Sequence, residues 1–282
     1  MKGSNIQQLK SSFLMAFFCS GIILTPAIAP GWAETISPQS ANLVTQANPT
    51  ASPNTLPTQV ANRLLLEVAR DTGISKSKLK IAEIKPAGFN GCLGIFRPNQ
   101  ACTKILIRGW QAIITGPRRT FVYHLSQDAS RIAQNDTASG AKIAVRVSFE
   151  LFGGSENIPK LESNAIFKSS VSGDLTGSTT TFILTDDGKV TKFQSSPTAR
   201  FSPVVVKTLT SQQLQQFKKL LENRRFPNFN GLSYLTSAAV ADFPTTTYQS
   251  QDTVTQYISL EQNSMPRSLQ QVINAWEKII AM

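Results

Sequence analysis

Two cysteines and the strand-forming segments behind them constrain this chain more than any other feature. The run GCLGIFRPNQACTKILIRGWQAIITGPRRTFVY, residues 91–123, holds them at Cys92 and Cys102. Apolar segments then meet across Gly116-Pro117, a dipeptide typical of turns. We therefore expect a loop between the two cysteines that leads into a β-hairpin. This is a structural signature, and nothing in it indicates a reaction centre.

The first 33 residues have the organisation of a secretory signal peptide. Their N-terminal region contains two lysines and no acidic residue, and an apolar core follows at 13–24. We expect cleavage after Gly31-Trp32-Ala33; Ala27-Ile28-Ala29 fits the small-residue rule better, but a cut there would leave a proline first. The core is shorter than the roughly 20 residues that span a bilayer. We expect no stable transmembrane anchor, with an uncleaved anchor as the alternative.

Removal of residues 1–33 leaves Cys92 and Cys102 as the only cysteines. In an oxidising compartment a disulfide is the default, and closing this loop would stabilise the fold by roughly 2.5–3 kcal/mol. Two free thiols are the alternative. One histidine and two cysteines cannot make a zinc site of four Cys and His ligands. We expect neither a metal nor a cofactor.

The remaining chain divides by composition. Residues 34–57 are mostly Ser, Thr, Asn, Gln and Pro, and we expect a disordered linker there. Two modules follow, 58–141 and 142–282. The predicted fold class is α+β, with each module an antiparallel sheet packed by one or two helices. Exported material of this kind belongs in the periplasm or outside the cell, with the thylakoid lumen as the alternative.

The first module begins with apolar residues at helical spacing over 58–72, ended by Gly73. Short apolar runs then predict strands. The first of these should stop at Pro86, because proline interrupts strand pairing. The expected strands are 79–85, 103–107, 110–114, 120–125 and 130–133.

The second module combines hairpins with two helices. Asp186-Asp187-Gly188 is a strong turn signal between two strands. Thr210 and Gln213 have the spacing of a capping box that begins a helix. A closing helix starts at Pro266, and its apolar face includes Trp276, which we expect in the core. The expected strands are 143–152, 178–185, 189–193, 204–209, 243–248 and 253–260.

Signals of catalysis are weak. The only histidine, His124, lies near Ser126 and Asp128, but a catalytic triad draws its members from separate elements. We interpret His124 as a structural residue at a strand edge. No phosphate loop, nucleophile elbow or dinucleotide fingerprint is present. A pair of catalytic carboxylates is not excluded, but we expect a protein that is not an enzyme.

The positive charge is concentrated in one half of the chain. Residues 58–145 hold 13 Lys+Arg against 5 Asp+Glu, whereas 146–282 hold 13 against 11. The first module should therefore attract an acidic protein, an anionic glycan or a membrane surface, and not nucleic acid. A solvated lysine face is the alternative. The candidate patch comprises Lys76, Lys78, Lys80, Arg97, Lys104, Arg108, Arg118 and Arg119, of which the three lysines would share one face if that segment were extended.

Two resemblances add to this interpretation. The pattern Gly91-Cys92-Leu93-Gly94, Cys102, Gly109-Trp110 and Val122-Tyr123 resembles a family of uncharacterised exported proteins of cyanobacteria, over about 60–140. That family often has arginine where this chain has His124, which argues against a specific role for the histidine. The resemblance implies export and a disulfide but no activity.

The order of elements in the second module is similar to that of emfourin-type inhibitors of metalloproteases. The positions that carry this similarity are Phe149, Gly153 and Gly154. Two functions are therefore expected. The first is a non-catalytic binding or scaffolding protein of the cell envelope or lumen, acting through the basic module on an unidentified protein or anionic glycan. The second is a secreted protease inhibitor acting through the second module.

Overall fold

The computed structural model describes residues 55–151, 154, 158–173, 177–236 and 243–281. All of them belong to one compact unit, Pro49–Met282. The expected signal peptide, most of the expected linker and Gly153 lie outside the described residues. Within the described residues the chain is α+β, as predicted, with two sheets in which antiparallel pairing predominates.

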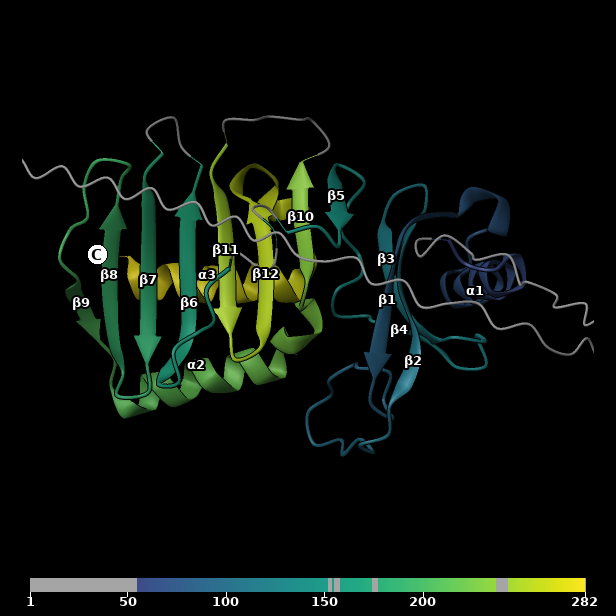
Figure 1. Cartoon of the computed structure of the whole chain (residues 1–282), viewed down its shortest axis with the longest axis horizontal. Helices are drawn as coiled ribbons and strands as arrows, with labels where there is room; N and C mark the ends of the chain where they lie inside the picture. Colours follow the sequence, from purple (N-terminus) through teal and green to yellow (C-terminus); the bar gives the residue numbers. More distant parts are fainter. Residues whose placement is uncertain (1–54, 152–153, 155–157, 174–176, 237–242, 282) are drawn as a thin grey trace, which may run out of the picture. The chain divides into compact units, whose positions relative to one another are not determined.

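The first sheet has four antiparallel strands in the order β1-β2-β3-β4, and a helix precedes it (Figure 1). Leu64 and Val68 on the helix share a core with Ile114 and Tyr123 of the sheet. The predicted helix and its end are confirmed, because Gly73 has φ 69° and its N–H bonds the carbonyl of Ala69. The elements are α1 (Thr58–Thr72), η1 (Lys76–Lys78), β1 (Lys80–Phe89), β2 (Ile107–Thr115), β3 (Thr120–Ser126) and β4 (Ile132–Gln134).

Strand β1 continues through Pro86, which pairs with Trp110, so the predicted stop at this proline is wrong. The physical reason is that β1 is an outer strand of its sheet, where one side has no partner and a missing N–H is tolerated. The expected strands at 103–107 and 110–114 are a single strand, β2. Residues 103–106 belong to the preceding loop, which we call the Cys loop (residues 90–106).

The Cys loop is closed by the disulfide Cys92–Cys102, whose Cα atoms are 5.5 Å apart. The amide oxygen of Asn90 accepts from the N–H groups of Cys92 and Gly94 at 3.0 and 3.1 Å. The Gly91 N–H bonds the Thr103 carbonyl at 2.9 Å and so joins the two ends of the loop. The expected disulfide is therefore present, on a loop with its own internal hydrogen bonds.

The second sheet has eight strands in the order β5-β10-β12-β11-β6-β7-β8-β9 (Figure 1). Neighbouring strands are antiparallel except for the parallel pair β10 and β12. The predicted hairpin around Asp186–Gly188 is confirmed, and the strands expected at 243–248 and 253–260 pair as a second hairpin around Gln251-Asp252. The strands are β5 (Val145–Ser148), β6 (Ala165–Ser172), β7 (Thr179–Thr185), β8 (Lys189–Ser195), β9 (Val204–Thr208), β10 (Leu232–Thr236), β11 (Thr245–Ser250) and β12 (Thr253–Ile258).

Two helices, α2 (Ser211–Asn223) and α3 (Arg267–Ile280), cover one face of this sheet (Figure 1). The capping box that begins α2 is confirmed, with the Thr210 hydroxyl accepting from the Gln213 N–H at 3.2 Å. Trp276 of α3 is fully buried, as predicted, and donates to the Ser169 hydroxyl at 2.8 Å. Pro266 is the residue before α3 rather than its first residue. The short helices η3 (Phe226–Phe229) and η4 (Ser259–Ser264) complete this half.

The strand expected at 143–152 is shorter in the structure, where β5 covers Val145–Ser148. The carboxylate of Glu83 on β1 explains where pairing stops, because it accepts from the Ser148 hydroxyl and from the Phe149 N–H, both at 2.9 Å. Strands β6 and β10 were not predicted. Both lie inside the sheet, where pairing on two sides supports segments with weak local signals.

The two sheets share one hydrophobic core cluster. Ile113 of β2 and Val122 of β3 belong to the same cluster as Tyr234 of β10. The Tyr234 hydroxyl also donates to the Ala138 carbonyl at 3.1 Å. The buried side chain of Asn228 adds hydrogen bonds to Phe96 in the Cys loop. Residues on either side of position 142 therefore pack against each other.

Candidate functional site

The C-terminal end of α1 forms one wall of the candidate site. The Thr72 hydroxyl donates to the Val68 carbonyl at 2.6 Å and accepts from the Ile74 N–H at 3.3 Å. The chain then enters η1, in which the Lys78 N–H bonds the Ser75 carbonyl at 2.9 Å. This tight turn fixes the backbone that carries Lys78.

The turn between β2 and β3 forms the opposite wall. The Gly116 N–H bonds the Arg119 carbonyl at 2.9 Å, and the Arg118 carbonyl accepts from Ile143 at 3.2 Å. The side chains of Arg118 and Arg119 are exposed. A Cβ on Gly116 would lie 3.2 Å from Phe121 and 3.3 Å from Ile74, so the absence of a side chain here lets the two walls approach each other.

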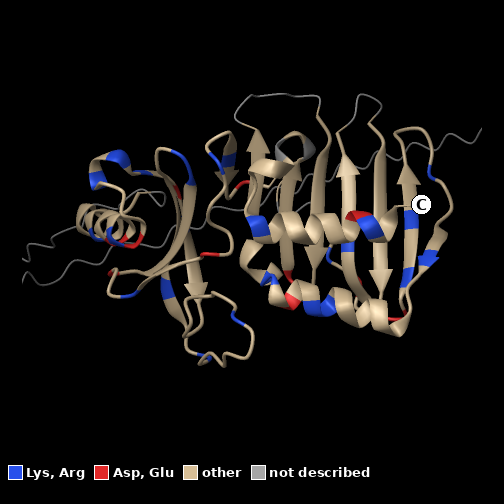
Figure 2. Ribbon diagram, turned by 180° about the vertical axis from the view of Figure 1, so that it is seen from behind, with Lys and Arg blue, Asp and Glu red and all other residues tan. Residues whose placement is uncertain are grey.

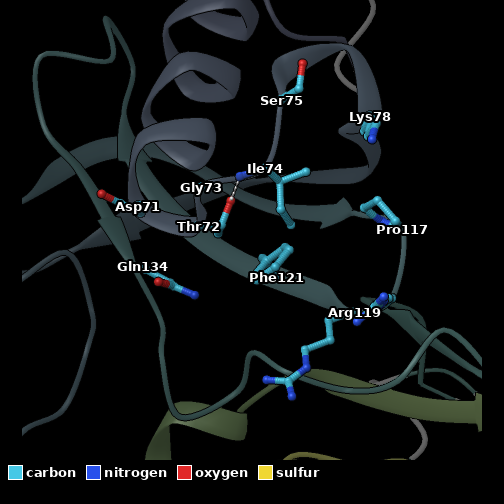
Figure 3. A pocket seen from close by; sticks show the side chains of 11 residues that line it. Asp71, Thr72, Gly73, Ile74, Ser75, Lys78, Pro117, Arg119, Phe121 and Gln134 are labelled. Carbon is cyan, nitrogen blue, oxygen red and sulfur yellow. Dashed lines mark hydrogen bonds between the residues drawn. The ribbon is translucent and has the colours of Figure 1, made fainter.

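A cavity of about 720 Å³ lies between these walls, and we call it the basic pocket. Figure 3 shows the side chains of Ile74 and Phe121 next to each other in the middle of the pocket, with Lys78 and Arg119 to one side of them. The pocket thus combines an apolar floor with cationic groups. Its lining residues are Asp71, Thr72, Gly73, Ile74, Ser75, Lys78, Pro117, Arg118, Arg119, Phe121 and Gln134.

The charge of the basic pocket is not balanced within the described residues. The side chains of Lys78, Arg118 and Arg119 make no hydrogen bond or ion pair with any of them. The lining acid, Asp71, accepts from the Tyr123 hydroxyl at 3.1 Å and lies 3.8 Å from the Arg70 guanidinium. Burial, and then the Asp71 charge, raise the pKa of Tyr123, so its hydroxyl remains a donor.

This arrangement suits an anionic group. Guanidinium groups bind carboxylates, sulfates and phosphates in a bidentate manner, and an ammonium adds a point charge. The apolar floor leaves room for the carbon skeleton of such a ligand. No group of three or more His, Cys, Asp or Glu residues that could hold a metal ion occurs among the described residues.

A second hollow of about 570 Å³ adjoins the Cys loop. Two of its three arginines already have partners within the protein: Arg70 forms an ion pair with Glu67, and Arg131 donates a hydrogen bond to the Gly91 carbonyl. Arg97 alone among its three arginines has no partner for its side chain within the described residues. This hollow is therefore a weaker candidate than the basic pocket.

The predicted basic patch is divided by the structure. The basic pocket brings together Lys78, Arg118 and Arg119. The segment of the three lysines is not extended, because η1 covers Lys76–Lys78, and so the condition for one shared face is not met. The Lys76 ammonium donates to the Asn62 amide at 2.9 Å, and Lys80 begins β1. The remaining three cations, Arg97, Lys104 and Arg108, lie in or next to the Cys loop.

Sequence reasoning missed the rest of the basic pocket. Ile74, Phe121 and Gln134 are distant in sequence and meet only through folding. Asp71 and Thr72 belong to the predicted helix and carried no signal of a site. The one local signal was the Gly116-Pro117 turn followed by two arginines, which indicates cations at a fixed bend.

His124 is buried in β3, an inner strand, rather than at a strand edge. Its Nδ1 lies 2.6 Å from the Leu93 carbonyl, and its ring stacks on Phe89 with centroids 5.0 Å apart. Nδ1 carries the proton, since a carbonyl can only accept, and Nε2 then faces the Gln111 amide at 3.3 Å. Burial lowers the pKa of His124, although the bond to Leu93 opposes this. The histidine fastens the Cys loop to the sheet.

Two of the three positions of the inhibitor resemblance, Phe149 and Gly154, lie within the described residues and make contacts within the fold. Phe149 is half-buried against the core, and its N–H donates to Glu83. Gly154 has φ 78° and its N–H bonds the Leu151 carbonyl at 3.0 Å. None of these contacts favours a strand that is free to enter a protease cleft, and the inhibitor function stays a prediction.

Taken together, the fold and the site define an α+β protein with a disulfide-closed loop and a cationic pocket on its smaller sheet. Residues 61–133 match a protein family described as a domain of unknown function (DUF8738). The match contains both cysteines of the disulfide, His124 and the three pocket cations. Comparison with curated proteins and with solved structures gives no significant match.

Proposed function

We propose that this protein is an exported, non-catalytic binding protein that holds an anionic group in the basic pocket. The observation that carries the proposal is the convergence of Lys78, Arg118 and Arg119, whose charges no described residue neutralises, over the apolar pair Ile74 and Phe121. A bound anion would supply the missing partners. A sulfated or carboxylated glycan and an acidic protein segment both have this chemistry.

Export is the second part of the proposal, with the periplasm or the cell exterior as the compartment and the thylakoid lumen as the alternative. The disulfide Cys92–Cys102 supports it, because structural disulfides persist where the environment is oxidising. Among the described residues no helix has the length and apolar character to cross a membrane. Sequencing the N-terminus of protein from its native host tests the proposal: a start at Glu34 is expected, and an intact Met1 overturns it.

Heparin, a sulfated polysaccharide, is a suitable probe for the basic pocket. The triple variant Lys78→Gln, Arg118→Gln, Arg119→Gln removes the pocket cations without changing buried residues. Three exposed ion pairs of about 0.5 kcal/mol each correspond to a rise in Kd of about tenfold. The variant should therefore elute from a heparin column at lower salt than the native protein.

A matched control removes the same charge from the second half of the chain. Lys207→Gln, Lys219→Gln, Lys278→Gln changes three exposed lysines that lie outside the basic pocket. The control should elute close to the native protein. Equal shifts in the two triple variants would show binding by net charge alone, and flow-through of the native protein at low salt would remove the proposal.

A further inference from the structure

The segment between the disulfide and β2 exposes two adjacent aliphatic side chains. Ile105 is 55% exposed and Leu106 is 72% exposed. Leu106 is the most exposed large apolar side chain among the described residues. Single exposed apolar residues are common, but an adjacent exposed pair, here where the Cys loop enters β2, marks a contact surface.

The register of the first sheet places Leu106 beside a cation. Gly88 of β1 pairs with Arg108 of β2, and cross-strand partners point to the same face. A Cβ on Gly88 would meet the Cδ1 atom of Leu106 at 2.9 Å. Leu106 and Arg108 therefore lie on the same face of the sheet, at its end.

Three cations lie in or next to the same loop. Arg97, Lys104 and Arg108 are exposed, and their side chains have no hydrogen bond or ion pair with the described residues. Between Glu83 and Asp128 the sequence contains no acidic residue. Figure 2 shows blue segments and no red on this loop.

The Cys loop presents these side chains from a fixed backbone. Besides the disulfide, the loop is held by the Phe96 N–H, which donates to the Asn228 amide oxygen at 2.7 Å, and by the Leu93 carbonyl, which binds His124. A rigid loop loses little conformational entropy when it meets a partner. The exposure of Ile105 and Leu106 is thus a property of the folded protein.

We propose that the Cys loop docks the protein on an anionic lipid surface. Ile105 and Leu106 enter the headgroup region, while Arg97, Lys104 and Arg108 bind lipid phosphates. Charge complementarity selects this partner, since juxtamembrane cations attract anionic leaflets and aliphatic groups add apolar burial. A soluble glycan would satisfy the cations but would leave the two aliphatic side chains in water. The docking surface shares no residue with the basic pocket, so the two proposals stand separately.

Co-sedimentation with vesicles tests the docking surface. The protein is the chain from Glu34, which retains the whole compact unit and lacks the apolar leader. The probes are vesicles of phosphatidylcholine with phosphatidylglycerol, and vesicles of phosphatidylcholine alone. We expect binding to the anionic vesicles only, and a fall in the partition coefficient of about tenfold or more in Ile105→Ser, Leu106→Ser.

The control is Leu66→Ser, Leu260→Ser, which changes two side chains with exposures of 58% and 52%. Each has a glutamate next to it in the sequence. This control should bind like the native protein, and Lys104→Gln, Arg108→Gln should bind more weakly. Thermal unfolding of each variant verifies that it is folded.

Three results would overturn the proposal. In the first the native protein binds neither kind of vesicle, and in the second it binds both kinds equally. The third result is that the double variant Ile105→Ser, Leu106→Ser binds the anionic vesicles as well as the native protein does. In the last case, loss of binding in the Lys78→Gln, Arg118→Gln, Arg119→Gln variant would assign the vesicle contact to the basic pocket instead. If the native protein does not bind heparin but does bind the anionic vesicles, the proposal for the basic pocket fails and the proposal for the Cys loop stands.

Discussion

His124 shows how a residue with catalytic potential becomes part of the scaffold. Both ring nitrogens face partners that suit the neutral ring: Nδ1 donates to the Leu93 carbonyl, and Nε2 is directed at the Gln111 amide group. No carboxylate is among its contacts within the described residues. Protonation would add a charge to a buried ring without supplying a counter-ion, which is why burial lowers its pKa.

The stability of the protein should therefore fall as the pH drops below 6.5. In the unfolded chain His124 takes up a proton near its ordinary pKa of 6.5, whereas in the folded chain it does so only at lower pH. The unfolded state then binds more protons, and the free energy of unfolding decreases by up to about 1.4 kcal/mol per pH unit. Urea unfolding between pH 7 and about 5, above the range of ordinary carboxyl groups, measures this slope.

The variant His124→Gln provides the comparison, because the chain has no other histidine. It should be less stable at neutral pH, since the stack on Phe89 is lost. Its free energy of unfolding should be nearly independent of pH over the same interval. An identical slope in the variant would show that other groups cause the pH dependence.

At the scale of elements, the Cys loop depends on a covalent link as well as on hydrogen bonds. Cys92 and Cys102 are ten positions apart in the sequence. Leu93 adopts a left-handed conformation with φ 53°, which an unconstrained leucine rarely takes. The disulfide limits the alternatives open to this segment in the unfolded chain.

Removal of the disulfide by Cys92→Ser, Cys102→Ser should lower the free energy of unfolding by about 2.5–3 kcal/mol in the chain-entropy model. For a unit of this size that corresponds to a decrease in Tm of about 5–10 °C. Chemical denaturation of the chain from Glu34, with and without reductant, measures the effect. The double serine variant should be insensitive to reductant, and equal stability of the oxidised and reduced native protein would contradict the prediction.

Elements with a local chemical signal could be predicted from the sequence, and those without one could not. Three signals act within a few residues of the chain, and each marks an element that the structure contains. Gly73 marks the end of α1, the capping box at Thr210 marks the start of α2, and the Asp186–Gly188 turn marks the β7–β8 hairpin. Strand β6 carries serines and a lysine that obscure its alternation, and it forms because β11 and β7 pair with it on both sides. Pro86 is tolerated because β1 is an outer strand, which is a property of the whole sheet.

The candidate site was predictable only in part for the same reason. Charge counting located the cations in the first half of the chain, but their division between two surfaces follows from the fold. Lys78 reaches the basic pocket because η1 turns the chain after α1, and Arg119 reaches it from the opposite turn. The apolar floor at Ile74 and Phe121 had no signal separate from that of ordinary core residues.

At the scale of the whole molecule, the two sheets should unfold together. The core cluster that contains Ile113 and Val122 of the first sheet also contains Phe167 and Trp276 of the second half. Arg225 adds an ion pair with Asp136 at 3.0 Å. Separation of the halves would expose part of one continuous core, and so an intermediate with only one sheet folded should not accumulate.

Asn228 allows this coupling to be measured. Its side chain is 4% exposed, accepts from the Phe96 N–H at 2.7 Å, and donates to the Phe96 carbonyl at 3.0 Å and to the Thr137 hydroxyl at 3.1 Å. The variant Asn228→Ala leaves these groups without partners, and we expect a loss of about 2–4 kcal/mol. Asn223→Ala, at an exposed position, should change stability by less than about 0.5 kcal/mol.

Far-ultraviolet circular dichroism and tryptophan fluorescence of the chain from Glu34 should report one coincident transition, both in the native protein and in Asn228→Ala. The fluorescence probes are Trp110, which packs against the first sheet's own core cluster, and Trp276, which lies in the shared cluster, so they sample both halves. If the two halves are coupled, the substitution at Asn228 should lower the free energy of unfolding by the same amount in the circular dichroism and in the fluorescence measurement. The reason is that either half loses its packing surface when the other unfolds. Two separate transitions, with only one displaced in the variant, would show that each sheet is stable by itself.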